Sequence, residues 1–590
     1  MKKVLALVLA VVMLLGVAAC GDNTTTTDKV TPPTLTYLYN TSDGHKAIGE
    51  YLQQAVAVAG ITMNLENQEW NTFLNTRKNG DYFIARNGWL ADYNDPICFL
   101  DMWTTESGNN DVQFGKGAHA ELAMYNMDLT AFGGEKVENG TWAQTYDVLI
   151  KKIKSTTDAE DRYALMHIAE DMLMETGCIV PLYYYTDLYM IDETVNGFFS
   201  NPLGYKYMMY TDVNGSTDAL NVCLASEPDT LDPALNSAVD GATMVAHLFS
   251  GLAKWAQDEA GNLVIVADAA KELVEGVTNE DGTVTYTYTL RDGMKWSNGD
   301  AVKASDFVNS WKRAASTELG ADYGYMFEVV KGYGTEENID AVADDAAGTI
   351  TITLSNAVAY WNELLAFPTY YPVHSSAFDN ESWATDPSTY ICNGAYTISA
   401  WEHDSVITLK KNDNYIDADK VTMKQINCYL SDDSNNMLAN FKKGDWLLID
   451  DVPTNEIANL KTEYPTEFII AGQIGTYYVC WNVNADLLPG STLTGVEKEK
   501  AQQEIRNAIG LLYDRNYIVE EIGQAGQVPA SSFVAMGMTD ADGNEFYKNA
   551  NKEAGNSFVG FFDTSKEAYE ANCKAAIETL KKYYDIKVAE

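Results

Sequence analysis

Residues 85 to 96 read ARNGWLADYNDP and bring three kinds of side chain together within seven residues. Arg86 supplies a guanidinium, Trp89 a flat indole and Asp92 a carboxylate. A guanidinium can receive a carboxylate through two parallel hydrogen bonds, and a carboxylate forms strong charge-assisted hydrogen bonds with an ammonium group. The stretch therefore raises the question of which ligand needs a cation, a flat wall and an anion so close together.

The signatures of common enzymes are absent from the sequence. It contains no GxSxG elbow, no HExxH pair, no Walker phosphate loop and no Rossmann glycine fingerprint. The six histidines are scattered, and the acidic stretch TDADGNE (539–545) has Glu545 where a calcium loop needs glycine. We therefore expect no enzyme, no catalytic residue, no metal site and no cofactor. A secreted hydrolase stays open as an alternative class.

Composition limits the class of protein. A chain of 590 residues is too long for one hydrophobic core, so we expect at least two domains or lobes. The sequence is 46% hydrophobic and 21% charged, which is typical of a folded globular protein. Its net charge of −44 would repel a polyphosphate over most of the surface. We therefore expect no nucleic-acid partner.

The N-terminal residues have the layout of an export signal. Lys2 and Lys3 precede an apolar run, residues 4–17, which is too short for an ordinary membrane span. The sequence VAAC that ends in Cys20 resembles the lipobox of bacterial lipoproteins, in which the cysteine is lipidated after cleavage. We therefore expect a lipid anchor on Cys20 that holds the protein at the cell membrane, facing outside the cytoplasm. A plain secretory signal is the alternative.

Seven cysteines remain after Cys20, and no CxxC pair occurs among them. An odd number without such a pair does not support a disulfide framework in so long a chain. We expect these cysteines to be small buried hydrophobic residues.

Helical and strand patterns alternate along the chain. Apolar residues recur at helical spacing in three segments and alternate with polar residues in three others. The mixture indicates α/β lobes. The predicted helices are 45–60, 159–175 and 566–584, and the predicted strands are 283–290, 348–354 and 405–411.

Long sequence motifs are spread over nearly all of the chain that follows the N-terminal segment. They include LASEPDTLDPAL (224–235), LRDGMKWSNGDAVKASDFVNSWKR (290–313), NGAYTISAW (393–401), GTYYVCWN (475–482) and NQEWNTFLNTRKNGDYFIARNGWLADYNDP (67–96). Together these motifs resemble the oligopeptide and dipeptide solute-binding proteins of bacterial ABC importers, the bacterial extracellular solute-binding proteins of family 5. The resemblance implies an α/β, two-lobed periplasmic-binding-protein-like fold of the class II, cluster C type, with a hinge.

The order of the motifs differs from that of the family. The part that resembles the end of the family's sequence, residues 35–212, comes first here, and the part like its beginning, residues 219–590, follows. We therefore expect a circular permutation in which VNGSTD (213–218) joins the family's natural termini. Surface termini that lie close together make such a rearrangement physically tolerable.

The resemblance also predicts how the chain divides. The hinge strands match LYYYT (182–186) and GTYYVCWN (475–482). The expected parts are a lipoprotein signal peptide at 1–19, the lipidated cysteine and a flexible tether at 20–34, lobe two at 35–185 plus 476–590, and lobe one at 186–475.

A receptor for peptides of many sequences must bind the groups that all peptides share. An extended peptide can add as a strand to exposed backbone, whatever its side chains are. The resemblance assigns the peptide ammonium to Asp92 and the pairing edge to the backbone from Gly88 through Leu90 to Asp92. It gives Trp89 the role of a wall of a side pocket.

The resemblance places other residues at the far end of the peptide. Arg86, Arg77 and His45 match positions that receive the peptide carboxylate. Each residue has a structural alternative. Asp92 could pair with Arg86 on the same loop, Arg77 and His45 could be solvated or capping residues, and Trp70 could belong to the core. The weaker candidates for lining the cleft are Tyr185, Tyr323, Tyr325 and Trp70.

The resemblance implies capture without chemistry. Two lobes would close by hinge motion around an extended oligopeptide, and the loaded monomer would deliver it to an ABC transporter permease. One alternative is the same scaffold serving an oligosaccharide, a nickel chelate or a signalling peptide. Another is a domain-swapped or non-functional product of the permutation.

Overall fold

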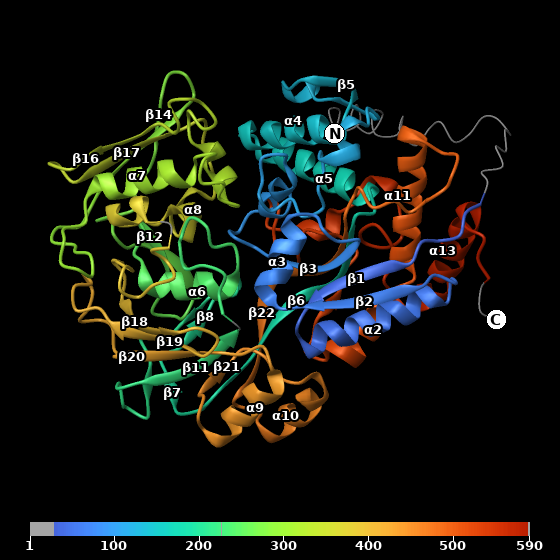
Figure 1. Cartoon of the computed structure of the whole chain (residues 1–590). Helices are drawn as coiled ribbons and strands as arrows, with labels where there is room; N and C mark the ends of the chain where they lie inside the picture. The colour runs from blue at the N-terminus through green and yellow to red at the C-terminus, as the bar shows by residue number, and fades with distance from the viewer. Residues whose placement is uncertain (1–28, 226, 381, 588–590) are drawn as a thin grey trace. The chain divides into compact units, whose positions relative to one another are not determined.

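The computed structural model describes residues 29–225, 227–380 and 382–587 (Figure 1). The predictions of a signal peptide, of lipidation at Cys20 and of most of the tether lie outside these residues. Within them, no helix has both the length and the apolar character needed to cross a membrane. The seven cysteines of this part are free, and all except the half-buried Cys573 are buried, as predicted.

The described chain forms two compact units of mixed α/β structure. The first unit consists of the residues up to Ala91, of Asp95–Tyr185 and of the residues from Ile474 onward. The second unit consists of Asp92–Asn94 and Thr186–Gln473. The strands β6 (Ile179–Ile191) and β22 (Phe468–Trp481) each contribute residues to both units.

In the first unit, a mixed sheet has the order β6, β22, β3, β1, β2. The strand β1 (Leu35–Asn40) pairs in parallel with both β2 (Met63–Gln68) and β3 (Ile84–Leu90), whereas β22 is antiparallel to β3. Parallel neighbours need a crossover connection. The helix α2 (Asp43–Ala57) connects β1 to β2, and the helix α3 (Trp70–Lys78) connects β2 to β3.

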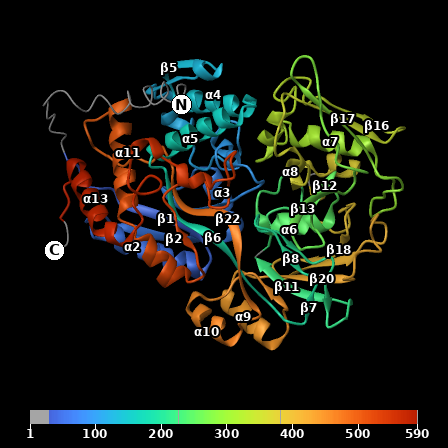
Figure 2. The ribbon, with the colours of Figure 1, turned by 180° about the vertical axis from the view of Figure 1, so that it is seen from behind.

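Helices pack against this sheet in the first unit. The helix α2 begins after Ser42, whose side chain accepts a hydrogen bond from the N–H of His45, and it buries Ile48, Leu52 and Val56. The helices α11 and α13 lie side by side in both views (Figures 1 and 2). The helices of this unit are α2 (Asp43–Ala57), α3 (Trp70–Lys78), α4 (Trp142–Ser155), α5 (Ala159–Glu175), α11 (Gly495–Leu511), α12 (Arg515–Tyr517) and α13 (Tyr569–Tyr583). The remaining strands are β4 (Tyr125–Asp128), β5 (Lys136–Gly140) and β23 (Val528–Pro529).

The second unit has two main sheets. One has the order β18, β19, β20, β11, β21, β6, and the other is an antiparallel sheet ordered β14, β15, β17, β16, against which the helix α7 packs. The strands are β7 (Val195–Asn196), β8 (Phe199–Ser200), β9 (Lys206–Tyr207), β10 (Asp212–Val213), β11 (Leu220–Ala225), β12 (Ala253–Gln257), β13 (Leu263–Ala267), β14 (Val277–Thr278), β15 (Val284–Thr289), β16 (Ala341–Asp344), β17 (Thr349–Leu354), β18 (Tyr396–Glu402), β19 (Val406–Lys411), β20 (Gln425–Leu430) and β21 (Leu448–Ile449). The helices are α6 (Val239–Leu248), α7 (Ala304–Ala314), α8 (Trp361–Leu365), α9 (Ser434–Lys443) and α10 (Ile457–Glu463).

The periodic segments formed the predicted elements. The helix expected at 159–175 has these bounds in α5, and those expected at 45–60 and 566–584 are α2 and α13 with ends moved by a few residues. The three predicted strands are β15, β17 and β19. Apolar spacing and turn residues were therefore sufficient to identify these elements.

Two local features lie where the expected circular permutation would join the family's termini and separate its blocks. The segment 213–216 is a tight turn in which Val213 and Ser216 exchange backbone hydrogen bonds of 2.8 and 2.9 Å. Asn214 and Gly215 have φ angles of 50° and 80°, as an Asn-Gly hairpin turn requires. In the first unit, Val30 forms backbone hydrogen bonds with Tyr583 and Asp585, both of 3.0 Å.

Candidate functional site

The strand β3 carries four of the predicted ligand-binding residues: Arg86, Gly88, Trp89 and Leu90. One edge of β3 pairs with β22 over its whole length, from Ile84 to Leu90. On the other edge, β1 pairs only with Ile84 and Ala85. In the described ladder, residues 86–90 therefore have a neighbouring strand on one side alone, which leaves their second edge available to an added strand.

Gly88 lies directly beneath the Tyr185 hydroxyl. A Cβ atom added at position 88 would lie 2.2 Å from Oη of Tyr185, far inside van der Waals contact. Gly475, on the neighbouring strand β22, is restricted in the same way, because its Cβ would lie 2.3 Å from Leu90 and 2.9 Å from the Tyr185 ring. A side chain at either position would therefore collide with Tyr185 or Leu90, and glycine at both positions lets the Tyr185 ring pack against β3 and β22.

Arg86 lies in an aromatic environment. Its guanidinium carbon is 5.7 Å from the ring centres of Trp70 and Tyr477 and 5.9 Å from that of Phe73. Such cation–π contacts are worth about 0.5–2 kcal/mol each. Among the described residues of the first unit, no carboxylate forms an ion pair with Arg86.

His45 connects Arg86 to Tyr477. The Nε of Arg86 donates to Nε2 of His45 at 3.1 Å, and Nδ1 of His45 lies 3.2 Å from the Tyr477 hydroxyl. Burial, and after it the charge of Arg86, lowers the pKa of His45 well below its usual value. The imidazole is therefore neutral near pH 7, and because Nε2 accepts, the proton is assigned to Nδ1, which donates to Tyr477.

Arg77 has a different environment. It lies on α3 with 9% of its surface exposed, and its Nε is 2.7 Å from Oδ2 of Asp111. The same carboxylate accepts a hydrogen bond of 3.1 Å from the amide of Asn87. Arg77 therefore already has a buried carboxylate partner, which the sequence analysis did not anticipate.

Trp89 is fixed by its own loop. Its side chain is buried, and its indole Nε1 donates to the carbonyl oxygen of Cys98 at 2.9 Å. Asp95 accepts two hydrogen bonds from Arg162, of 2.8 and 2.9 Å, which ties the loop after β3 to α5. The indole is therefore held rigidly within its own loop, and its role as a pocket wall stays a prediction.

In the second unit, Asp92 lies beside Tyr323. The Tyr323 hydroxyl donates to Oδ1 of Asp92 at 2.9 Å, and Tyr323 is 6% exposed. The neighbouring residue Tyr93 stacks on Tyr360, with ring centres 4.5 Å apart and an angle of 8° between the planes. Tyr325 is buried next to Tyr323, at 6.1 Å between ring centres. The half-buried carboxylate of Asp92 therefore lies beside buried tyrosine rings.

The structure thus groups the predicted residues into two sets. The first unit holds Arg86, His45 and Trp70 in one cluster, while Arg77 pairs with Asp111. Gly88 lies on β3 with Arg86, and Tyr185 contacts it from β6. The second unit holds Asp92, Tyr323 and Tyr325. Sequence reasoning missed Tyr477 and Phe73 as members of the Arg86 cluster. For Tyr477 the signal was its place within the quoted segment GTYYVCWN.

No group of three or more His, Cys, Asp or Glu side chains in the described part of the chain has the geometry of a metal site. The first unit has a strand edge of β3 without a neighbouring strand and a guanidinium without an acid partner. The second unit has a carboxylate among tyrosines, that of Asp92.

Comparison with known proteins decides the family. The family model described as "Bacterial extracellular solute-binding proteins, family 5 Middle" matches residues 15–111 and 268–582, well over half of the chain. The chain belongs to this family. The sequence resemblance to these solute-binding proteins is therefore confirmed.

Two curated relatives from Bacillus subtilis (strain 168) illustrate the similarity. The chain is 33% identical over 352 residues to the oligopeptide-binding protein OppA, a match that covers 57% of this chain and 59% of the relative. It is 27% identical over 348 residues to the dipeptide-binding protein DppE, covering 57% and 58%. The solute-binding chain thus spans less than two thirds of the length of these relatives.

A solved structure supports the fold. The murein tripeptide binding protein MppA of Escherichia coli superposes with a TM-score of 0.50 and 23% sequence identity, over 61% of this chain and 66% of MppA. This solute-binding protein therefore has the periplasmic-binding-protein-like α/β fold that the resemblance implied, although identity at this level says nothing about its ligand.

Proposed function

We propose that this protein is an extracytoplasmic peptide-binding protein that captures oligopeptides and delivers them to an ABC import permease. Capture needs no bond to be made or broken, so the proposed protein is not an enzyme and needs no cofactor. As the family resemblance implies, the peptide would be held in a cleft between two lobes that close by hinge motion.

The open edge of β3 is the observation that carries this proposal. An extended peptide paired with residues 86–90 would form main-chain hydrogen bonds that do not depend on its side chains. Arg86 has no acid partner in the described chain, so its fork can receive the α-carboxylate. We propose that Asp92 pairs with the α-ammonium, with the Tyr323 hydroxyl orienting its carboxylate.

The other predicted residues have secondary roles in this proposal. Trp89 would be the wall of a side pocket, and Tyr185 would fix the register of the edge above Gly88. His45 would orient Arg86 instead of binding the carboxylate itself. Trp70 would stack on Arg86, and Tyr325 would line the pocket beside Tyr323. Arg77 has the weakest support as a ligand contact, because Asp111 already neutralises it.

We also propose that the two units are lobes connected in circularly permuted order. Two features support this proposal. The turn at 213–216 is short enough to join two strands, and the segment after α13 hydrogen-bonds with Val30. Matches to curated relatives over little more than half of the chain also agree with it, because a linear alignment follows only one of two exchanged blocks.

The proposed place of action is the outer face of the cell membrane. The family consists of extracellular proteins by its description, and the sequence ending at Cys20 supports a lipid anchor there. We propose that the protein acts as a monomer.

Calorimetric titration with blocked peptides tests the proposal. Trialanine and pentaalanine are compared with forms that are acetylated at the N-terminus or amidated at the C-terminus. We expect the free peptides to bind, and each block to weaken binding at least tenfold. If both blocks left the affinity unchanged, or if no peptide bound, another solute would replace peptide as the ligand class.

A size measurement addresses the alternatives that concern assembly. Native mass spectrometry of the purified chain is expected to give a monomer that releases a set of short peptides on denaturation. A dimer would instead indicate domain swapping between permuted chains.

A further inference from the structure

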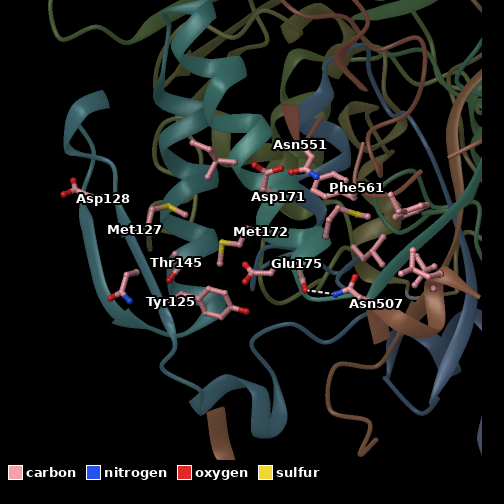
Figure 3. A pocket seen from close by; sticks show the side chains of 18 of the residues that line it. Tyr125, Met127, Asp128, Thr145, Asp171, Met172, Glu175, Asn507, Asn551 and Phe561 are labelled. Atoms are coloured by element: carbon pink, nitrogen blue, oxygen red, sulfur yellow. Dashed lines mark hydrogen bonds between the residues drawn. The ribbon is translucent and has the colours of Figure 1, made fainter. Parts of the chain in front are cut away.

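The first unit contains a cavity of about 430 Å³ that is separate from every predicted peptide-binding residue (Figure 3). It lies between α5, the hairpin of β4 and β5, α11 and the loop around residues 551–562. Apolar side chains make up most of its wall, among them Met127, Met172, Val180, Leu511 and Phe561. Its size is that of a pocket for a small molecule.

Three carboxylates line the cavity: Asp128, which accepts hydrogen bonds from the N–H and hydroxyl groups of Thr130, and the pair Asp171 and Glu175. Asp171 and Glu175 are one helical turn apart on α5, and both line the cavity. In the part of the chain that the structure describes, neither Asp171 nor Glu175 forms an ion pair with Lys or Arg, and the charge of Lys500 acts on Glu175 without such a pair. Like charges at this spacing destabilise a helix. Burial, followed by the charges of Glu175 and Glu553, raises the pKa of Asp171 to about 7.

The cationic side chain of the wall, Arg515, has its own partners. Its Nε donates to the carbonyl of Pro181 at 2.8 Å, and its Nη1 donates to the carbonyls of Gly510 and Tyr513 at 3.0 Å. Its guanidinium also stacks on Phe562, 4.0 Å from the ring centre. Arg515 is therefore held by backbone and ring contacts and does not neutralise the two acids.

We propose that this cavity is a second ligand site, which binds a small apolar molecule that carries a primary ammonium group. The apolar body would fill the space beside Met127, Met172 and Phe561, where flexible thioethers adapt to different shapes. The ammonium would lie between Asp171 and Glu175 and supply the ion-pair partner that both acids lack. A carboxylate ligand would instead meet two acids of its own sign.

Three ligands of matched shape test the proposal. Tryptamine, tryptophol and indole-3-propionate share an indole body and differ in a cationic, neutral or anionic end group. Titration calorimetry with the purified full chain is expected to show tryptamine binding at least tenfold more tightly than tryptophol, with indole-3-propionate weakest. Equal affinities for the three, or no binding of tryptamine, would overturn the proposal.

Variants locate the binding. Asp171→Asn is expected to reduce the affinity for tryptamine to that for tryptophol, and Met172→Trp to abolish binding of both by filling the cavity. Glu160→Gln removes the same charge from an exposed position of the same helix and should leave the affinity unchanged. The melting temperature of Met172→Trp shows whether this variant folds. If it does not fold, the affinity of Asp171→Asn for tryptamine alone tests the proposed site.

Competition separates the two ligand sites. Saturating trialanine is expected to leave tryptamine binding unchanged, because the cavity shares no lining residue with the predicted peptide site. If trialanine displaced tryptamine, the amine would be occupying the peptide site and the cavity proposal would be wrong. If trialanine does not bind at all, the variant series still tests the cavity independently of the peptide proposal.

Discussion

The Nε atom of Arg86 lies 3.1 Å from Nε2 of His45 and donates a hydrogen bond to it. Because the imidazole is neutral, this contact holds the guanidinium in place without cancelling its charge. No acid of the described part of the first unit pairs with the guanidinium, so its positive charge is available to a ligand. Arg86 is thus positioned by a neutral partner and three rings.

Replacing Arg86 should affect only peptides with a free carboxylate. Arg86→Gln removes a charge-assisted contact worth about 1.5–3 kcal/mol, so we expect trialanine affinity to fall about 10- to 100-fold. The C-terminally amidated peptide should bind wild type and variant equally. Lys574→Gln, an exposed change, serves as the control. An equal loss for both peptides would assign Arg86 a structural role.

Asp92→Asn should weaken the binding of peptides through their other end, the ammonium group. We expect an affinity loss of about 10- to 100-fold for peptides with a free ammonium group, and no loss for N-acetylated peptides. Tyr323→Phe removes one hydrogen bond to Asp92 and should cost about 0.5–1.5 kcal/mol of peptide binding. Titration calorimetry measures both. Full peptide affinity in Asp92→Asn would contradict the proposed ammonium site.

Replacing Arg77 should lower the stability of the protein and leave its peptide affinity nearly unchanged. Arg77→Met leaves the buried carboxylate of Asp111 without its cation, and we expect the free energy of unfolding of the first unit to fall by about 3–5 kcal/mol. Chemical denaturation measures this loss. The double variant with Asp111→Asn should recover part of it, because no isolated charge remains. Peptide affinity below the unfolding transition should change less than threefold. A larger change would return Arg77 to the ligand contacts.

Gly88→Ala should clash with Tyr185. The added methyl group would lie 2.2 Å from the Tyr185 hydroxyl oxygen, so we expect a destabilisation of about 1–3 kcal/mol and weaker peptide binding. Tyr185→Phe removes that oxygen and should restore part of the stability when combined with Gly88→Ala. A thermal unfolding series of the two single variants and the double variant measures the coupling. Additive effects would mean that the two residues do not meet.

Glu170 should make stability depend on pH. It lies buried on α5 and accepts hydrogen bonds from the N–H groups of Phe533 and Val534, at 2.9 and 2.8 Å. Burial raises its pKa to about 8 from an ordinary value of 4.5. Because the pKa is higher in the folded state, its contribution to stability is complete below about pH 4.5 and is lost as the pH rises through 8.

The variant Glu170→Gln tests this dependence. Relative to wild type, we expect it to become more stable by about 2–5 kcal/mol between pH 5 and pH 8. Melting temperatures across this range measure the difference, and Glu160→Gln is the control. The stability of the variant should still depend on pH to some extent, because the pKa of Asp171 is also raised. A constant difference at every pH would mean that Glu170 is ionised throughout.

The sequence was sufficient for local structure. Asp158 caps α5, and the apolar spacing of the residues that follow predicted the bounds of this helix. Both signals depend only on residues that are close together in the sequence. The Arg86 cluster depends on distant segments. His45 and Tyr477 are separated by more than 400 residues and meet because β22 pairs with β3.

The partner of Arg77 could not be predicted for the same reason. Asp111 lies in an irregular stretch between helices, where no periodicity says which way a side chain points. The cavity beside α5 was missed as well. Its wall combines residues from two distant parts of the chain, 125–180 and 507–562, which no local pattern brings together.

The place of β22 in the first unit has a consequence for synthesis on the ribosome. This strand lies between β6 and β3 in the sheet, yet it follows β6 by roughly 300 residues in the chain. At about 5–20 residues per second, translation would take roughly 15–60 s to supply it. During that delay the nascent β3 and β6 would keep strand edges that their final neighbour has yet to cover. The second unit, which is nearly continuous, ends at Gln473 inside β22, so its folding does not have to wait for the last part of the first unit.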